Sequence, residues 1–265
     1  MLLVLTHDVD WGRRGPSVEH ILARLDRFDW IYRYKFFTLK ENIYNGIPDI
    51  LEYEQRQGIK STFFFRVFYD DNTTAELYSD MISELRRGGW EVGLHANNGD
   101  SLDVIFLEKK VLEKIYADNI YSLRVHYLKI KPEIIPKLSS IGIKFDSSFC
   151  MSKTKPSLES TDCIIYGNVV ELPITIMDTY MFTYWGIRPG ETYTKLIEIL
   201  KGFNNAGVKI VTLLWHANSV KMYGGREYLR LIEEILRFEW ITPVKIIDLA
   251  MYIYRDKVSC KKLYE

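Results

Sequence analysis

Segments with the pattern of a buried β-strand alternate with segments that have the pattern of a helix, about seven times along the chain of 265 residues. This alternation predicts a parallel sheet whose strands are joined by helical crossovers. Seven or eight such units in a chain of this length are typical of a barrel. No segment has the composition of a linker, so we expect residues 1–265 to form a single domain. The expected strands are residues 2–10, 59–67, 90–95, 122–126, 142–146, 169–172, 209–215 and 244–246.

The first expected strand carries two acidic residues at its end. An apolar run from Leu2 to Leu5 leads into Asp8 and Asp10, which are separated by one residue. Because side chains alternate along a strand, both carboxylates face the same side. Two ionised carboxylates this close repel each other, a cost that a metal ion or acid–base chemistry would explain. The alternative is a strand end whose aspartates only make turn and cap hydrogen bonds.

Polar side chains also stand at the ends of other expected strands, which is where sites form in parallel α/β folds. Three of the five histidines are among them, whereas His7 and His20 carry no such signal and are expected to be structural. We therefore expect the strand-end residues to lie together at one end of the barrel. They are Asp8, Asp10, His95, Arg124, His126, Asp146 and His216.

In this order, the strand-end residues resemble the motifs of the polysaccharide deacetylases of the NodB type, carbohydrate esterase family four. The resemblance covers nearly the whole chain, and five ordered motifs together are more specific than any one of them. It implies a distorted (β/α) barrel of seven or eight parallel strands and the removal of N-acetyl groups from an amino sugar or polysaccharide by hydrolysis. The five counterparts are Thr6-His7-Asp8-Val9-Asp10, Gly93-Leu94-His95-Ala96-Asn97-Asn98-Gly99, Arg124-Val125-His126-Tyr127, Phe145-Asp146-Ser147-Ser148-Phe149 and Leu213-Leu214-Trp215-His216.

The resemblance implies a general base and a general acid. Asp8 would take a proton from the attacking water, and Arg124 would keep Asp8 ionised and oriented. His216 would protonate the leaving amine, while Asp146 would orient His216 and raise its pKa. The backbone N–H of Tyr127 would stabilise the oxyanion. The alternatives are a plain salt-bridge role for Arg124 and a turn role for Asp146.

The resemblance also implies a divalent metal, zinc by preference, with Asp10 and His95 as ligands. The family's second motif has a further histidine four residues after the first, but that position is Gly99 here. Two protein ligands alone would make a weak site. His126 could supply a third ligand, or it could be structural or face the substrate. The other candidates for the third ligand are Asn97, Asn98 and Asp100.

Charge and composition limit the classes of partner. Lys+Arg and Asp+Glu are 35 each, so the formal net charge is zero and indicates neither a nucleic-acid nor a membrane-surface partner. Aromatic residues make up 14% of the chain, which suits sugar stacking or core packing. The aromatic insertion at residues 28–47 is our candidate for a wall over the substrate. With the resemblance, we expect an N-acetylated amino sugar as substrate, and nothing indicates the oligomeric state.

No apolar run has the length needed to span a bilayer, and the first residues lack a signal-peptide pattern, so we expect a cytoplasmic protein. The three cysteines contain no CxxC pair and predict neither a disulfide framework nor a cysteine metal site. A Cys150–Cys163 bridge is an option that nothing in the sequence supports.

Three functions follow from these observations. The first is a metal-assisted deacetylase. The second is a metal-independent amide hydrolase on the same fold that uses Asp8 and His216. The third is a catalytically inactive carbohydrate-binding protein.

Overall fold

Eight parallel strands form the centre of the fold in the computed structural model, which describes residues 1–255 and 258–262. Their order in the sheet is β7-β5-β4-β3-β2-β1-β9-β8. The expected distorted barrel of seven or eight parallel strands is therefore confirmed. The bounds are β1 Leu2–Val9, β2 Thr62–Phe65, β3 Glu91–Ala96, β4 Ser122–Val125, β5 Phe145–Asp146, β7 Val169–Glu171, β8 Ile176–Met177 and β9 Ile210–Leu214.

β1 lies in the middle of this sheet, and all eight of its residues are buried. A strand of a parallel sheet is covered on both faces, which explains why its sequence is a nearly continuous apolar run. β9 pairs with one edge of β1, and β2 pairs with the other edge from Thr6 to Val9. A short strand, β10 (Thr242–Val244), pairs with the beginning of that second edge. The C-terminal end of β1 is therefore held between two neighbours, where it carries Asp8.

The sheet is curled and open rather than fully closed. In the described part of the chain, no ladder joins β7 to β8, although four residues connect them. At the β7 edge, β6 (Ile164–Tyr166) pairs antiparallel with β7, and β11 (Lys261–Lys262) pairs with β6. The barrel is distorted because it stays open between β7 and β8.

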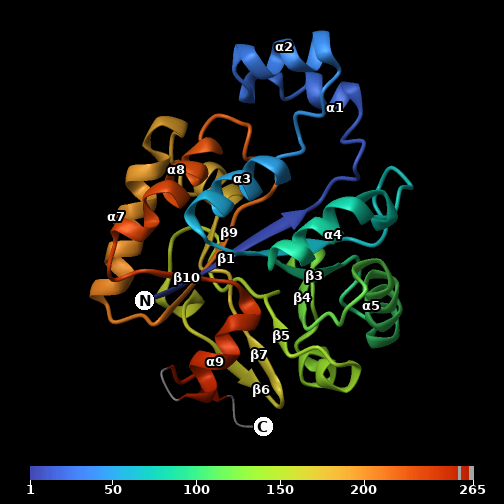
Figure 1. Ribbon diagram of the computed structural model, residues 1–265. Helices are drawn as coiled ribbons and strands as arrows, with labels where there is room; N and C mark the ends of the chain where they lie inside the picture. The colour runs from blue at the N-terminus through green and yellow to red at the C-terminus, as the bar shows by residue number, and fades with distance from the viewer. Residues whose placement is uncertain (256–257, 263–265) are drawn as a thin grey trace.

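Helices cover the outside of the curled sheet (Figure 1). Among the described residues, none of them combines the length and the apolar composition that a bilayer span requires. Residues Pro132–Ile141 form a 3₁₀ helix. The α-helices are α1 Val18–Leu22, α2 Trp30–Leu39, α3 Ile47–Gln57, α4 Ser79–Gly88, α5 Leu102–Tyr116, α6 Asp178–Thr183, α7 Thr192–Asn205, α8 Arg226–Glu234 and α9 Leu249–Tyr254.

The aromatic insertion at residues 28–47 differs from our expectation. It contains a regular helix, α2, capped at its N-terminus by Asp29, whose side chain accepts a hydrogen bond from the backbone N–H of Tyr32. Figure 1 shows α1 and α2 projecting from one extremity of the molecule rather than folding over the sheet. The part of the insertion that contains α2 therefore projects from the molecule, and the role of the insertion as a wall over the substrate stays a prediction.

The disulfide also differs from the one considered from the sequence. Cys163 bonds to Cys260, with 4.6 Å between their Cα atoms, and Cys150 is free. The cause is strand pairing, because Cys163 precedes β6 and Cys260 precedes β11, and these two strands lie side by side. Strand pairing over a separation of 97 residues cannot be read from cysteine spacing.

Candidate active site

A buried ion pair forms the floor of the candidate site. Oδ1 of Asp8 accepts a hydrogen bond of 2.8 Å from Nη1 of Arg124, whose side chain is fully buried. The same nitrogen also donates to Oγ1 of Thr6, while Nη2 and Nε bond to the side chain and backbone oxygen of Ser147. The guanidinium lies over the ring of Phe64, 4.5 Å from its centre. These contacts fix the orientation of Asp8 and place a positive charge beside it.

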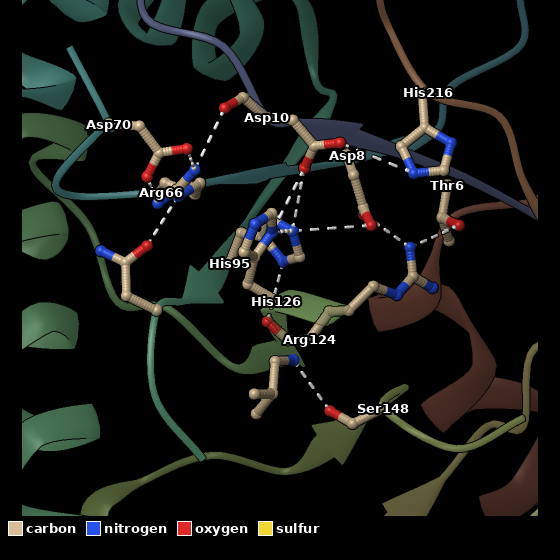
Figure 2. A network of polar contacts seen from close by, with 12 residues as sticks. Thr6, Asp8, Asp10, Arg66, Asp70, His95, Arg124, His126, Ser148 and His216 are labelled. Atoms are coloured by element: carbon tan, nitrogen blue, oxygen red, sulfur yellow. Dashed lines mark hydrogen bonds and ion pairs between the residues drawn. The ribbon is translucent and has the colours of Figure 1, made fainter. Parts of the chain in front are cut away.

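Three side chains converge above this pair, as Figure 2 shows. Oδ1 of Asp10 lies 3.2 Å from Nε2 of His95 and 3.5 Å from Nδ1 of His126, and the two ring nitrogens are 3.1 Å apart. Nδ1 of His95 lies 3.0 Å from the backbone oxygen of Arg124. Because a backbone carbonyl can only accept, Nδ1 of His95 carries a proton, and Nε2 is the ring nitrogen that faces Asp10 and His126.

This arrangement fits a divalent metal ion. A tetrahedral site with metal–ligand distances of about 2.0–2.1 Å separates neighbouring ligand atoms by roughly 3.3 Å. The three observed separations scatter closely around that value. Two imidazoles and one carboxylate also match the ligands found in zinc sites with an open coordination position.

His126, rather than the residues around Gly99, supplies the third candidate ligand. A Cβ on Gly99 would lie 2.4 Å from the backbone oxygen of Lys129, so this position has no room for a side chain. The other candidates point elsewhere: Asn97 bonds to Arg66 and to the backbone of Phe68, and Asp100 pairs with Lys131. Among the described residues, Asp10, His95 and His126 form the group that could hold a metal ion.

His216 and Asp178 form a second pair of polar side chains, on the opposite side of Asp10. Nδ1 of His216 is 2.5 Å from Oδ1 of Asp178, and Nε2 of His216 is 3.6 Å from Oδ2 of Asp10. Asp178 is buried and also accepts from the side chain of Ser219 and the backbone N–H of His216. Burial would lower the pKa of His216, but the charges of Asp178 and Asp10 outweigh it and raise the pKa to about 10. The ring is therefore held in a protonated state with one N–H turned toward the site.

Asp146 does not hold His216, contrary to our expectation. The sheet order explains the difference: four strands separate β5, which carries Asp146, from β9, whereas β8 pairs with β9 and leads directly into Asp178. Oδ1 of Asp146 accepts from Ser148, and Asp146 lies opposite Glu171 in the β5–β7 pairing. One oxygen of each carboxyl group has no other partner.

The pKa values of Asp146 and Glu171 are both raised. Burial, followed by the charge of Asp146, raises the pKa of Glu171 well above its ordinary value, and burial also raises the pKa of Asp146. Burial disfavours the ionised form of each carboxyl group, and a negative charge on one disfavours a second negative charge on the other. Ser148, which donates to Asp146, also accepts from the backbone N–H of Val125 at 2.9 Å. The pair therefore supports the end of β4, next to Arg124 and His126.

The turn after β4 has an unusual backbone. Tyr127 and Leu128 both have positive φ values, 58° and 57°, which non-glycine residues rarely adopt. Such conformations cluster at functional sites, where the surrounding structure holds them. The ring of Tyr127 is 73% exposed and lies 3.9 Å from the ring of His126, measured between ring centres. This turn brings Tyr127 to the wall of the site cavity.

Two adjoining cavities open beside these groups. One has a volume of about 510 Å³ and contains Asp8, Asp10, His95, His126 and His216 in its lining. The other has about 500 Å³ and shares Asp10, Thr179 and His216 with the first. Each is large enough for a sugar unit. Further lining residues are Tyr127, Lys129, Lys153 and Tyr180 in the first cavity, and Asp26, Arg27, Phe182 and Tyr223 in the second.

Sequence reasoning missed two residues of the site. Asp178 follows the segment Ile174-Thr175-Ile176-Met177, a mostly apolar strand end like the one that marked Asp8, but this segment was too short to be recognised as a strand. Arg66 directly follows β2 and donates to the backbone oxygen of Asp10 at 3.3 Å, and it also pairs with Asp70. The rule that polar residues at strand ends form the site would have found both.

Solved structures with the same architecture exist. A protein from Mycobacterium smegmatis assigned as a polysaccharide deacetylase superposes with a TM-score of 0.70, at 18% identity, over 100% of this chain and 93% of its own. A protein from Pseudomonas aeruginosa PAO1 with the same assignment superposes with a TM-score of 0.64, at 11% identity, over 96% of this chain and 91% of its own. The fold is that of the polysaccharide deacetylases.

The polysaccharide deacetylase fold also occurs with other chemistry. The 4-alpha-glucanotransferase from Thermococcus litoralis superposes with a TM-score of 0.57, at 14% identity, over 99% of this chain and 41% of its own. No protein-family model matches the sequence, and a search of curated proteins finds no match. The function therefore has to be argued from the residues of the site.

Proposed function

We propose that this protein is a metal-assisted hydrolase that removes N-acetyl groups from an amino sugar or polysaccharide. One observation carries the proposal: a candidate metal site, a buried carboxylate and a histidine held by a second buried carboxylate, Asp178, all face one cavity. Hydrolysis of an amide needs a base for the attacking water and an acid for the leaving nitrogen. Asp8 and His216 are the two side chains placed for these roles.

Asp10, His95 and His126 would hold the divalent ion, with zinc as the ion that best suits this ligand set. When bound, such an ion polarises the amide carbonyl and makes a coordinated water more acidic. The carbonyl oxygen of Arg124 fixes the tautomer of His95, so the residue that holds Asp8 also orients a ligand.

Two residues on either side of Asp10 would each transfer one proton, Asp8 as the base and His216 as the acid. Asp8 accepts the proton of the attacking water through Oδ2, because Arg124 occupies Oδ1. His216 donates its Nε2 proton to the leaving nitrogen, and Asp178 holds the ring and its charge from the other side. The backbone N–H of Tyr127, in the strained turn after β4, stabilises the oxyanion.

The lining of the cavities supports a carbohydrate substrate. Tyr127 and Tyr180 border the first cavity, and Phe182 and Tyr223 border the second. Aromatic rings stack on the apolar faces of sugars, and the two adjoining cavities could hold consecutive units of a chain. The cytoplasmic location stays a prediction. The disulfide between Cys163 and Cys260 argues for an oxidising compartment instead.

Acetate release from N-acetylglucosamine oligomers tests the proposal. We expect the wild-type protein to release acetate, and we expect Asp8→Asn and His216→Ala to lower the rate by about 10²-fold or more each. Asp103→Asn, which changes an exposed carboxylate at the start of α5, is the control and should have no effect. Unchanged rates in the two site variants would refute the mechanism.

Two further outcomes identify the alternative functions. Acetate release that survives complete removal of metal would indicate a metal-independent hydrolase that uses Asp8 and His216. Binding of the oligomers without any acetate release, with and without added metal, would indicate a carbohydrate-binding protein.

A further inference from the structure

The exposed hydrophobic side chains are concentrated on the projection formed by residues 18–40, here called the α1–α2 projection. Of the 20 large hydrophobic residues that are exposed in the described part of the chain, seven lie in this short segment. Trp30 is the most exposed of all, at 75%. Single exposed hydrophobic residues are normal, whereas a cluster of them marks a contact surface. The seven are Val18, Leu22, Trp30, Ile31, Tyr34, Phe37 and Leu39.

The outer face of α2 is aromatic. Trp30, Tyr34 and Phe37 are spaced three and four residues apart, so they share one face of the helix. The opposite face contacts the body through Tyr32 and Phe36, which pack against a small cluster around Phe28. None of the ten residues of α2 is buried. The helix therefore presents its aromatic face outward, and none of the residues that the structure describes covers it.

The charge of this helix has one sign. Residues 30–40 contain Arg33, Lys35 and Lys40 but no aspartate or glutamate. Lys35 pairs with Glu41, while the other two basic residues have no acidic partner among the described residues. The zero net charge of the whole chain conceals this local excess. An exposed tryptophan beside other exposed aromatic residues, with lysine and arginine in the same helix, suits contact with the interface of an anionic membrane.

The position of the projection suits a flat surface. Figure 1 shows α1 and α2 at an extremity of the molecule, beyond the helices that cover the sheet. The base of the projection adjoins the site, because the backbone oxygen of Arg27 accepts from the N–H of Tyr223 and both residues line the second cavity. A surface that contacts α2 would therefore lie near the opening of that cavity.

We propose that the α1–α2 projection docks on an anionic lipid membrane through the aromatic face of α2. A second copy of the chain fits less well, because a symmetric contact through this face would bring its basic residues against each other. An anionic surface instead attracts Arg33, Lys35 and Lys40 while Trp30, Tyr34 and Phe37 enter the interface. This docking does not depend on the proposed reaction.

Co-sedimentation with lipid vesicles tests the docking. We expect the wild-type protein to bind vesicles of phosphatidylcholine mixed with phosphatidylglycerol, and to bind phosphatidylcholine alone much more weakly. Trp30→Ala with Phe37→Ala should weaken binding by roughly tenfold or more. The matched control is Leu236→Ala with Met251→Ala, two exposed apolar residues elsewhere, which should bind as the wild type does.

Two further experiments test whether binding to vesicles depends on charge and whether the chain associates with itself. Arg33→Gln with Lys40→Gln should weaken binding to the mixed vesicles and reduce its salt dependence. Unchanged circular dichroism verifies that each variant is folded. The proposal is overturned if the wild-type protein remains in the supernatant with both vesicle types, or if the Trp30 and Phe37 changes have no effect. It is also overturned if sedimentation velocity shows a dimer that the same double variant dissociates.

Discussion

Oδ1 of Asp178 lies 2.5 Å from Nδ1 of His216, and these two residues come from neighbouring strands that meet at the open edge of the sheet. The contact leaves Nε2 of His216 facing Asp10 across 3.6 Å. A buried carboxylate behind a histidine fixes both its tautomer and its charge. Asp178, rather than Asp146, therefore controls the tautomer and the charge of His216, the proposed general acid.

Replacement of Asp178 tests this relationship. Asp178→Asn removes the negative charge behind His216, so we expect acetate release to fall by about 10²-fold or more. Asp146→Asn should lower the rate much less, because Asp146 contacts Ser148 rather than His216. Initial rates of both variants on the same oligomer measure the difference. Equal losses in the two variants would contradict the assignment.

The buried ion pair between Asp8 and Arg124 should be visible as coupling in stability. Arg124→Met leaves Asp8 buried without its counter-charge, which we expect to cost about 3–5 kcal/mol of unfolding free energy. Asp8→Asn in the same chain should recover part of that loss. Chemical denaturation of the two single variants and the double variant gives the coupling. Strict additivity of the two changes would show that the pair is not coupled.

We expect the close packing around Gly99 to require a glycine at this position. A Cβ there would lie 2.4 Å from the backbone oxygen of Lys129, so Gly99→Ala should destabilise the protein by about 1–3 kcal/mol. Gly190→Ala is the control, because a Cβ at Gly190 meets nothing within 4 Å, and it should change stability by less than about 0.5 kcal/mol. Thermal unfolding compares the two. Equal stability of both variants would mean that the loop can move to admit a side chain.

The raised pKa of Glu171 predicts how stability depends on pH. The pKa of Glu171 is raised in the folded state, so the folded protein binds more protons than the unfolded chain above about pH 4.5. Stability from this group is then complete below that pH and decreases as the pH rises toward the folded-state pKa. Glu171→Gln mimics the protonated form and should remove this decrease.

Thermal unfolding of wild type and Glu171→Gln from acidic to mildly alkaline pH measures the effect. We expect the variant to gain stability relative to the wild type as the pH increases. The exposed Glu133→Gln should follow the wild-type curve. Parallel curves for wild type and Glu171→Gln would show that Glu171 is ionised in the folded protein.

The sequence predicted those features that depend on local pattern. The apolar run before Asp8 and the apolar strand before His216 are visible in the residue order, and both residues lie at the ends of adjacent strands, as expected. The sequence pattern did not predict contacts between residues that are far apart in the chain. Asp178 follows a strand of only two residues, and the Cys163–Cys260 bond depends on the pairing of β6 with β11. The projection was recognised as an aromatic insertion, but its direction depends on packing around Phe28.

The central claim is that His126 completes a metal site with Asp10 and His95. Its most direct test is the metal content of protein that has been incubated with zinc and then desalted. We predict about one zinc ion per chain in the wild type and in the control His20→Ala, and the loss of most of it in His126→Ala. Equal zinc content in wild type and His126→Ala, or none in the wild type, would contradict the account.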